Sequence, residues 1–380
     1  MRLWNCSGKW MIPWKYDLIM KYIDEYRDKA LIMKLAELIK KSATGDYTFM
    51  EVCGGHTASI HRFGIPSLLP GNIRLVSGPG CPVCVTGEEF IDYAIECSAM
   101  ERVIIATFGD LMRVPGAFSS LDREKAAGAD IRVVLSGLEA LEIARSNPER
   151  TVIFLGIGFE TTAPGTAVTV MLAAKEGIKN FFLLSAHKVM PPAIEAIIKD
   201  GTRLNGFICP GHVAVITGAS AFKFIPEKYN LGCVITGFEP TDILYAILML
   251  VNQANRNTPC VEIQYSRAVN ADGNKIAQKY LSEIFEFSDT LWRGFGVIPA
   301  SGLKLGKKYE SFDAEKRFPV NVVFHEGSEA CICGEILRGL KTPADCTLFG
   351  STCLPETPAG ACMVSDEGAC NTYYKYKINE

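Results

Sequence analysis

The sequence TVIFLGIGFETT (residues 151–162) joins a continuous apolar run to a Gly-Phe-Glu turn, and a helical pattern over residues 166–176 follows it. The stretch VITGFEPT (residues 234–241) repeats this order, and ATFGD (residues 106–110) is a looser version. Apolar strands that alternate with helices are typical of βαβ units and parallel sheets. We therefore expect an α/β protein whose repeated turns follow the carboxyl ends of strands, where open α/β sheets bind ligands.

The same alternation extends from about residue 47 to about residue 260. The expected strands are Phe49–Val52, Ile73–Val76, Val103–Thr107, Ile131–Leu135, Thr151–Leu155, Asn180–Leu184, Gly206–Ile208 and Cys233–Thr236. The expected helices include Glu88–Ala99, Leu138–Ser146, Thr166–Glu176, Ala193–Lys199, Asp242–Gln253 and Ala271–Phe285, and a long N-terminal helix runs from Asp17 to about Ser42.

The repeated turn favours two related, doubly wound parallel-sheet domains around a cleft. The alternative is that βα turns use glycine and threonine for close approach and capping without any duplication. We expect an N-terminal extension and helix over residues 1–46, with residues 1–16 irregular. Two α/β domains are expected over residues 47–145 and 146–265, and a cysteine-rich domain over residues 266–380.

Composition narrows the class of protein. At 380 residues, with 48% hydrophobic and 21% charged residues, the chain fits a globular protein of two or three domains. A net charge of −3 without a basic run argues against nucleic acid as a partner. No apolar stretch approaches the ~18 residues that span a bilayer, and the N-terminus does not resemble a secretory signal. We expect a cytoplasmic protein, in which fourteen cysteines favour metal ligation or catalytic thiols over structural disulfides.

Six of the fourteen cysteines lie in the turn-rich C-terminal part, with the spacing C-x-C-x12-C-x6-C-x8-C-x7-C. They are Cys331, Cys333, Cys346, Cys353, Cys362 and Cys370. Four thiolates suffice for a [4Fe–4S] cluster, and two would remain as a disulfide or thiol pair. Zinc is the main competitor. The long and uneven gaps differ from the short paired knuckles of zinc ribbons, so the spacing favours an iron–sulfur site.

Two further thiol motifs lie upstream. Cys53 follows an apolar strand and opens the turn CGGH (residues 53–56), in which His56 adds an imidazole. A thiolate with an imidazole suits iron, zinc or copper, and the alternative is a buried cysteine beside a hydrogen-bonded histidine. Cys81 and Cys84 form a CxxC pair in GPGCPVC (residues 78–84), a spacing that closes a redox disulfide or binds a metal. A structural zinc site would need two more ligands nearby, and none is local.

The remaining cysteines have no partner at ligand spacing, and we interpret them as small buried hydrophobic residues. They are Cys6, Cys97, Cys209, Cys233 and Cys260. His187 and His212 each follow a β-rich run, which makes them weaker site candidates. No Gly-Lys-Ser/Thr phosphate loop is present.

Taken together, these motifs resemble the HypD family of hydrogenase maturation factors over about residues 47–376. The stretches that carry the resemblance are EVCGGHT (51–57), GPGCPVC (78–84), TFGD (107–110), MRVPG (112–116), GFETT (158–162), PGHV (210–213), GFEP (237–240), CGE (333–335), Cys346, LFG (348–350), Cys353 and SDEGAC (365–370). The resemblance implies two α/β domains around a cleft and a third domain that holds a [4Fe–4S] cluster.

The resemblance also implies a function. Such proteins act with the small partner HypC as the scaffold on which the Fe(CN)2CO group of [NiFe]-hydrogenase is built, and HypE, supplied by HypF, delivers the cyanide. A different hypothesis is a stand-alone iron–sulfur thiol–disulfide oxidoreductase that works through Cys81 and Cys84. A third is a structural zinc protein with a binding function only. The sequence leaves open whether the chain is an enzyme in its own right.

By resemblance, Cys53 holds the mononuclear iron that carries cyanide and carbon monoxide, and His56 lies beside it. Cys81 and Cys84 resemble a redox-active pair, and Glu367 matches an acidic residue on which function depends. The positions that match the cluster ligands are Cys333, Cys346, Cys353 and Cys370, which leaves Cys331 and Cys362 as a spare pair. Many relatives have His or an acidic residue where this chain has Ala58. We expect Cys81 and Cys84 to lie between Cys53 and the C-terminal cysteines.

Overall fold

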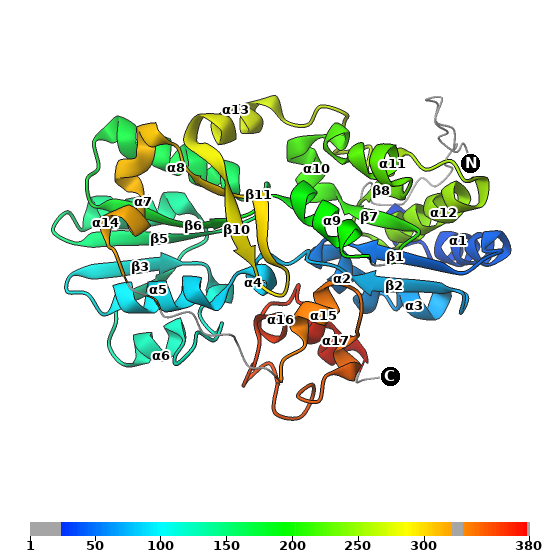
Figure 1. Ribbon diagram of the computed structural model, residues 1–380, viewed down its shortest axis with the longest axis horizontal. Coiled ribbons are helices and arrows are strands. Elements are labelled where there is room, and N and C mark those ends of the chain that lie inside the picture. The colour runs from blue at the N-terminus through cyan, green and yellow to red at the C-terminus, as the bar shows by residue number, and fades with distance from the viewer. Residues whose placement is uncertain (1–23, 202, 321, 323–329, 378–380) are drawn as a thin grey trace.

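The structure is a computed structural model that describes residues 24–201, 203–320, 322 and 330–377 (Figure 1). Two parallel sheets lie side by side, and the C-terminal segment lies below their junction in this view. The expected α/β class with parallel sheets is therefore confirmed. The expected irregular segment over residues 1–16, with Cys6, and the expected start of the first helix at Asp17 lie outside the described residues.

The first sheet has five strands in the order β2-β1-β7-β8-β9, and all its pairings are parallel. Its strands are β1 (Tyr47–Glu51), β2 (Ile73–Ser77), β7 (Gly206–Pro210), β8 (Gly232–Thr236) and β9 (Val261–Ile263). Every residue of β7 and β8 is buried. Strands buried on both faces have continuous apolar sequences, which is the pattern that predicted them.

The second sheet has four parallel strands in the order β4-β3-β5-β6. Its strands are β3 (Val103–Thr107), β4 (Ile131–Val133), β5 (Thr151–Gly158) and β6 (Phe181–His187). The two repeated Gly-Phe-Glu turns thus follow strands of different sheets, because β5 belongs to this sheet and β8 to the first.

The path of the chain differs from the expected division at residue 145. The chain begins the first sheet with β1 and β2, builds the whole second sheet, and then returns to the first sheet at β7. Phe49 of β1 is aligned with Gly206 of β7, a pairing between residues far apart in the sequence. The expected boundary between residues 145 and 146 therefore falls inside the second sheet rather than between the two sheets.

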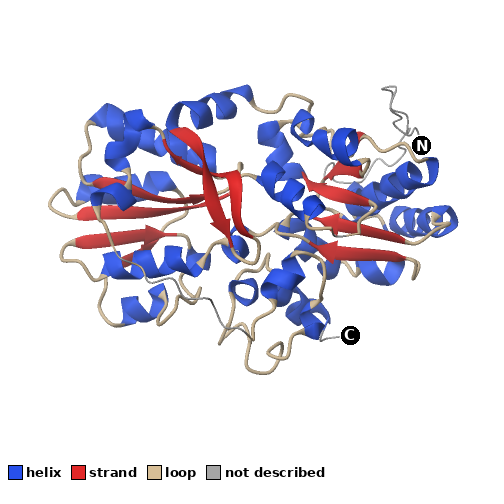
Figure 2. Ribbon diagram, in the orientation of Figure 1, coloured by secondary structure: helices blue, strands red, loops and turns tan. Residues whose placement is uncertain are grey.

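Helices lie above and below each sheet in Figure 2. Around the first sheet these are α1 (Lys29–Ser42), α2 (Gly54–Arg62), α3 (Ile65–Leu68), α10 (Gly211–Thr217), α11 (Phe224–Tyr229) and α12 (Pro240–Arg256). Around the second sheet they are α5 (Glu88–Ser98), α6 (Leu121–Ala126), α7 (Gly137–Ser146), α8 (Ala163–Glu176) and α14 (Ala314–Arg317). Nearer the junction are α4 (Pro82–Val85), α9 (Met190–Lys199) and α13 (Lys275–Ile284). The short 3-10 helices are η1 (Asp24–Tyr26), η2 (Gly109–Leu111), η3 (Ala219–Phe222), η4 (Lys307–Phe312) and η5 (Pro343–Asp345).

The residues after 265 separate into two parts. An antiparallel ribbon of β10 (Phe285–Trp292) and β11 (Gly296–Leu305) crosses between the two halves (Figure 1). The six C-terminal cysteines lie in the segment that contains α15 (Cys333–Leu337), α16 (Ala361–Val364) and α17 (Ala369–Lys377). In that segment α17 packs against α2, and α16 packs against α4. No helix in the described ranges is long and apolar enough to cross a membrane.

Candidate functional site

Cys53 lies at the carboxyl end of β1, directly before the first residue of α2. The Gly54 N–H donates to the carbonyl of Gly80 at 2.9 Å, so the Cys53 turn and the loop before Cys81 are in backbone contact. A Cβ atom on Gly80 would lie 2.2 Å from the backbone nitrogen of Cys53. Only glycine permits this approach. The two upstream thiol motifs therefore meet at one place.

The Cys53 thiol is partly buried and has no disulfide partner among the cysteines that the structure describes. Desolvation is the main cause that raises the pKa of Cys53 to about 12, and the negative charge of Glu367 adds to it. Glu367 lies against the same turn, because a Cβ atom on Gly54 would be 2.5 Å from its Cβ. Burial also raises the pKa of the Glu367 carboxyl. The thiol is thus protonated at neutral pH, and a soft cation that binds there must displace a proton.

Glu51, a residue that the sequence analysis did not single out, supports this turn from within the protein. Its carboxylate accepts hydrogen bonds from the Cys53 N–H at 3.2 Å and from the Thr57 hydroxyl at 2.6 Å. It is only 2% exposed, and desolvation raises its pKa to about 8. A charged residue at the end of an apolar strand is the sequence signal that indicates such a role.

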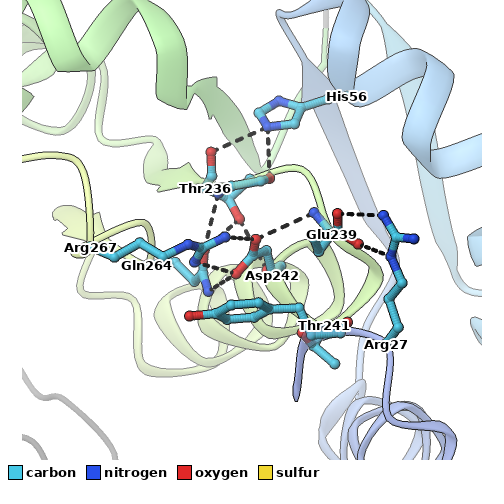
Figure 3. A network of polar contacts seen from close by, with 10 residues as sticks. Arg27, His56, Thr236, Glu239, Thr241, Asp242, Gln264 and Arg267 are labelled. Atoms are coloured by element: carbon cyan, nitrogen blue, oxygen red, sulfur yellow. Dashed lines mark hydrogen bonds and ion pairs between the residues drawn. The ribbon is translucent and has the colours of Figure 1, made fainter. Parts of the chain in front are cut away.

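His56 is fully buried, and its Nε2 lies 3.0 Å from the carbonyl oxygen of Gly237 and 3.3 Å from that of Thr236 (Figure 3). Carbonyl oxygens only accept, so Nε2 carries the proton and Nδ1 keeps a lone pair. Nδ1 is buried and has no hydrogen-bond partner among the described residues. Burial lowers the pKa of His56 to about 4, so the ring is neutral at pH 7. The imidazole therefore offers an unused donor atom for a metal ion.

The loop that holds His56 is fixed by charged residues (Figure 3). Asp242 is fully buried, and its carboxylate forms an ion pair with Arg267 and accepts from the Gln264 side chain at 2.8 Å. It also accepts the backbone N–H of Glu239 at 3.3 Å. Arg27 then holds the Glu239 carboxylate through two hydrogen bonds. The Gly-Phe-Glu repeat is visible in the sequence, whereas the ion pairs that support this loop join residues far apart in the chain.

Phe238 in the same loop stacks on the ring of His56 at 4.5 Å and on the ring of His212 at 4.0 Å. Phe238 also lies against Gly55, so the exposed His212, a weaker candidate in the sequence, lies near the Cys53 turn. His187 does not share this place: its ring nitrogens contact Gly158 and the Thr166 hydroxyl at the end of β5 and in α8.

Cys81 and Cys84 are joined by a disulfide, with 5.3 Å between their Cα atoms. Both residues are buried, and Cys81 caps the short helix α4. Gly80, which touches Cys53, is the residue directly before this pair. On its other side, α4 packs against α16, the helix that contains Cys362. The Cys53 turn is therefore in contact with the loop directly before Cys81, and the C-terminal segment packs against α4, which contains Cys84. That segment also reaches the Cys53 turn directly, through Glu367.

The six C-terminal thiols lie close enough to influence one another. The largest effect on Cys331 is a hydrogen bond with Cys333, which raises its pKa. Cys331 lowers the pKa of Cys333, whereas Cys362 and burial raise it, to about 12 overall. Burial raises the pKa of Cys370, and the charges of four other cysteines, Cys333, Cys331, Cys353 and Cys346, add to this. Cys333 thus interacts with both Cys331 and Cys362, the expected spare pair. The six cysteines therefore form one group of thiols, in which the four expected cluster ligands do not lie apart from the other two.

Within the described residues, no three His, Cys, Asp or Glu side chains stand in metal-binding geometry. The surroundings of the thiols nevertheless fit an anionic iron–sulfur group. Arg293 donates to the Thr86 carbonyl and to the Glu88 carboxylate, each at 3.0 Å. Its Nη2 is buried and has no hydrogen-bond partner in the part of the chain that the structure describes. Its charge acts on Cys331 and Cys333. An orphan cationic donor beside thiols suits sulfur that carries negative charge.

A backbone donor adds to this fit. The Ala359 N–H donates to the Cys353 sulfur at 3.3 Å. The Arg293 loop also approaches the cysteines closely, because a Cβ atom on Gly294 would lie 2.4 Å from the Cα of Gly334. Hydrogen bonds to sulfur are one of the means by which a protein sets the potential of an iron–sulfur cluster.

The cysteines interpreted as hydrophobic are mostly buried. Cys97, Cys209 and Cys233 have no solvent exposure, and Cys260 is partly exposed. The thiols of Cys209 and Cys233 are 3.2 Å apart on neighbouring strands β7 and β8, a proximity that sequence spacing does not reveal.

Comparisons with known proteins agree over nearly the whole chain. The family model HypD, described as "Hydrogenase formation hypA family", matches residues 29–377. The hydrogenase maturation factor HypD2 of Bradyrhizobium diazoefficiens is 48% identical over 368 residues, which cover 94% of this chain and 97% of that protein. HypD of Azotobacter vinelandii is 46% identical over 367 residues, with coverage of 94% and 97%. A putative hydrogenase expression/formation protein of Methanocaldococcus jannaschii is 43% identical over 352 residues, with coverage of 92% and 98%.

Proposed function

This chain belongs to the HypD family of hydrogenase maturation factors, and we propose that it is the scaffold on which an iron ion acquires its cyanide and carbon monoxide ligands. The observation that supports the proposal is the backbone contact between the Cys53 turn, which also holds His56, and the loop directly before Cys81 and Cys84. Among the described residues, the Cys53 thiol has no disulfide partner and the buried Nδ1 of His56 has no hydrogen-bond partner. The Cys81–Cys84 disulfide begins one residue after Gly80, the glycine that touches Cys53. Hydrogenase maturation is the family role; the chemistry below is our proposal for this chain.

Cys53 serves as the anchor for the iron. A soft thiolate helps to hold a low-spin Fe(II) that carries cyanide and carbon monoxide. Because the pKa of Cys53 is raised to about 12, binding of iron releases a proton. The Glu367 carboxyl beside this turn, whose pKa is also raised, is a candidate acceptor for that proton.

His56 supplies the second donor atom. Its Nε2–H is used by the carbonyl oxygens of Thr236 and Gly237, which fixes the tautomer with Nδ1 free. Its low pKa of about 4 keeps the ring neutral, and a neutral ring is the form that binds metals. Ala58 brings no polar side chain to the turn, so the donor set of this chain rests on Cys53 and His56.

The Cys81–Cys84 pair provides redox chemistry next to the anchor. Reduction of this disulfide takes up two electrons and two protons and gives two thiols, and oxidation returns them. A [4Fe–4S] cluster, held by Cys333, Cys346, Cys353 and Cys370, supplies electrons when bound. Cys331 and Cys362 would be the thiols through which the C-terminal segment exchanges with α4. This segment is suited to the task because α16 packs against α4.

Protein partners follow from the same proposal. HypC contributes a cysteine to the iron at Cys53, and HypE, loaded by HypF, delivers cyanide there in the cytoplasm. The partly exposed Cys53 and the exposed Glu367 beside it support such a contact, because both can be reached from outside.

A pull-down with HypC from an anaerobic extract, followed by metal analysis, tests the proposal. We expect the wild-type chain to retain HypC and iron beyond that of the cluster. Cys53→Ala should lose the additional iron and hydrogenase maturation, whereas Cys97→Ala, which removes a buried thiol outside the site, should lose neither.

The second candidate is a stand-alone iron–sulfur thiol–disulfide oxidoreductase, which the Cys81–Cys84 disulfide favours. It requires reduction of a protein disulfide without HypC and without mononuclear iron. Failure to retain HypC, together with dependence of that activity on Cys81 and Cys84, would replace the scaffold proposal by this one.

A further inference from the structure

A cavity of about 550 Å³ lies away from the cysteines, where the two halves of the protein meet the β10–β11 ribbon. The residues that line it belong mainly to the start of α9, the end of α10, one face of α13 and the β10–β11 ribbon. The helices and the ribbon converge in this region in Figure 1. A volume of several hundred Å³ is typical of sites for small molecules.

The wall is mostly apolar, and the side chains of Thr217, Gln278 and Ser282, which also line it, donate to backbone carbonyls. Leu281 of α13, Phe285 and Phe287 of β10 and Leu303 of β11 supply much of it. Phe287 is 67% exposed, so one aromatic ring lies open to solvent at this site. Among the residues that the structure describes, Glu160, from the repeated Gly-Phe-Glu turn after β5, is the only charged residue in the wall.

Glu160 is only 3% exposed, and one of its two carboxylate oxygens already accepts a hydrogen bond. One oxygen accepts the N–H of Met190, the first residue of α9, at 2.9 Å. The other oxygen, Oε2, is buried and has no hydrogen-bond partner among the described residues. A helix cap requires only one acceptor. The second oxygen therefore remains for a different donor, because a buried acceptor without a partner is costly.

The start of α9 disfavours an anion at this place. Pro191 and Pro192 follow Met190 and have no N–H groups. The Met190 N–H is taken by Glu160, and the Val189 N–H donates to the carbonyl of Ser301 at 2.9 Å. The cavity thus presents an acceptor but few free donors, which complements a cation or a hydrogen-bond donor.

We infer that this cavity binds a small apolar molecule that carries one amine, with the apolar part against the phenylalanine and leucine side chains and the ammonium group on Glu160. The ammonium group donates to the oxygen that has no partner among the described residues. Burial raises the pKa of Glu160 to about 7, and an ammonium group beside it favours the charged carboxylate. Such a hydrogen bond between charged groups is stronger than a neutral one. This site is separate from the proposed iron site, because no residue of the cavity wall belongs to the Cys53 turn or to the cysteine clusters.

Ligand-observed NMR and isothermal titration calorimetry with phenethylamine on the full chain, purified without oxygen, test the inference. The matched probes are 2-phenylethanol, which keeps the donor without the charge, and 3-phenylpropanoate, which replaces the amine by an anion. We expect saturable binding of phenethylamine, weaker binding of 2-phenylethanol and no binding of 3-phenylpropanoate.

Two variants locate the binding. Glu160→Gln keeps an acceptor for the Met190 N–H but loses the charge, and it should weaken phenethylamine binding at least tenfold. Ser282→Trp fills the cavity from α13 and should also weaken it at least tenfold, whereas Glu283→Gln, on the same helix but outside the cavity wall, should leave it unchanged. If Glu160→Gln does not fold, Ser282→Trp decides alone. The inference is overturned if phenethylamine does not bind, if 3-phenylpropanoate binds as well, or if the cavity-filling variant binds like the wild type.

Discussion

Gly80→Ala is the substitution that tests most sharply how the Cys53 turn meets the disulfide loop. The new Cβ atom would lie 2.2 Å from the nitrogen, 2.3 Å from the Cα and 2.5 Å from the carbonyl carbon of Cys53. These are backbone atoms, so no side-chain rotation relieves the overlap. The turn must move away from the loop that contains Cys81 and Cys84, which would separate the proposed iron anchor from its redox pair.

The expected loss of stability follows from the same geometry. Overpacking a well-packed core typically costs about 1–3 kcal/mol, and a clash with three backbone atoms belongs at the upper end of that range. An unfolding entropy of about 2.1 cal/mol/K per residue corresponds to roughly 0.8 kcal/mol/K for a chain of this length. A loss of about 3 kcal/mol therefore lowers Tm by roughly 4 °C.

Gly71→Ala is the matched control, because a Cβ atom on Gly71 would meet nothing within 4 Å. Thermal unfolding by circular dichroism and hydrogenase activity in a complemented deletion strain are the two assays. We expect Gly80→Ala to lower Tm and abolish maturation, and Gly71→Ala to do neither. Wild-type maturation and an unchanged Tm in Gly80→Ala would refute the close contact on which this site is built.

Three further predictions concern charged groups. Arg293→Gln removes the cation beside Cys331 and Cys333. It should shift the oxidised-to-reduced ratio of the iron–sulfur group about tenfold toward the oxidised form, or about 59 mV for one electron, in an EPR-monitored redox titration. The control is Arg145→Gln, on α7, where the arginine pairs with Glu176 of α8, and an equal shift there would contradict a specific role of Arg293. Glu51→Gln should raise stability most above pH 8: burial raises the folded-state pKa of Glu51 from 4.5 to about 8, so its contribution is fully present below pH 4.5 and is lost as the pH rises through 8. The difference in Tm between Glu51→Gln and the wild type should therefore grow between pH 5 and pH 8 and stay constant above it. A difference that does not change with pH would show that burial does not raise the pKa of this carboxyl. Asp242→Ala leaves the charge of Arg267 without its buried partner and should cost about 3–5 kcal/mol in denaturant unfolding, whereas a loss under 1 kcal/mol would show that the ion pair does not hold the loop.

Local patterns in the sequence predicted the strands well. Val103–Thr107 is observed with the expected bounds, and the strand expected at Thr151–Leu155 continues to Gly158. These strands are buried on both faces, so their apolar character is visible without knowledge of any partner. Their order in the sheets was not predictable in the same way, because pairing between Phe49 and Gly206 depends on contacts far apart in the chain.

In the candidate site, too, local motifs were visible in the sequence, whereas contacts between distant residues were not. Spacing alone identified CxxC, and the structure joins Cys81 to Cys84. The hydrogen bond from His56 to the carbonyl of Gly237 depends on backbone groups, which have no signature in the side-chain sequence. The role of Glu51 in holding the Cys53 turn was indicated in the sequence by a charged residue at the end of an apolar strand. The buried Nη2 of Arg293, which has no hydrogen-bond partner among the described residues, was not indicated by any sequence pattern.

Infrared spectroscopy of the chain purified together with HypC tests the central claim most directly. If Cys53 anchors the iron, the wild-type complex should show the stretching bands of iron-bound cyanide and carbon monoxide. The Cys53→Ala complex should lack these bands while it keeps the visible absorbance of an iron–sulfur cluster. Cyanide and carbon monoxide bands of wild-type intensity in Cys53→Ala would contradict the account.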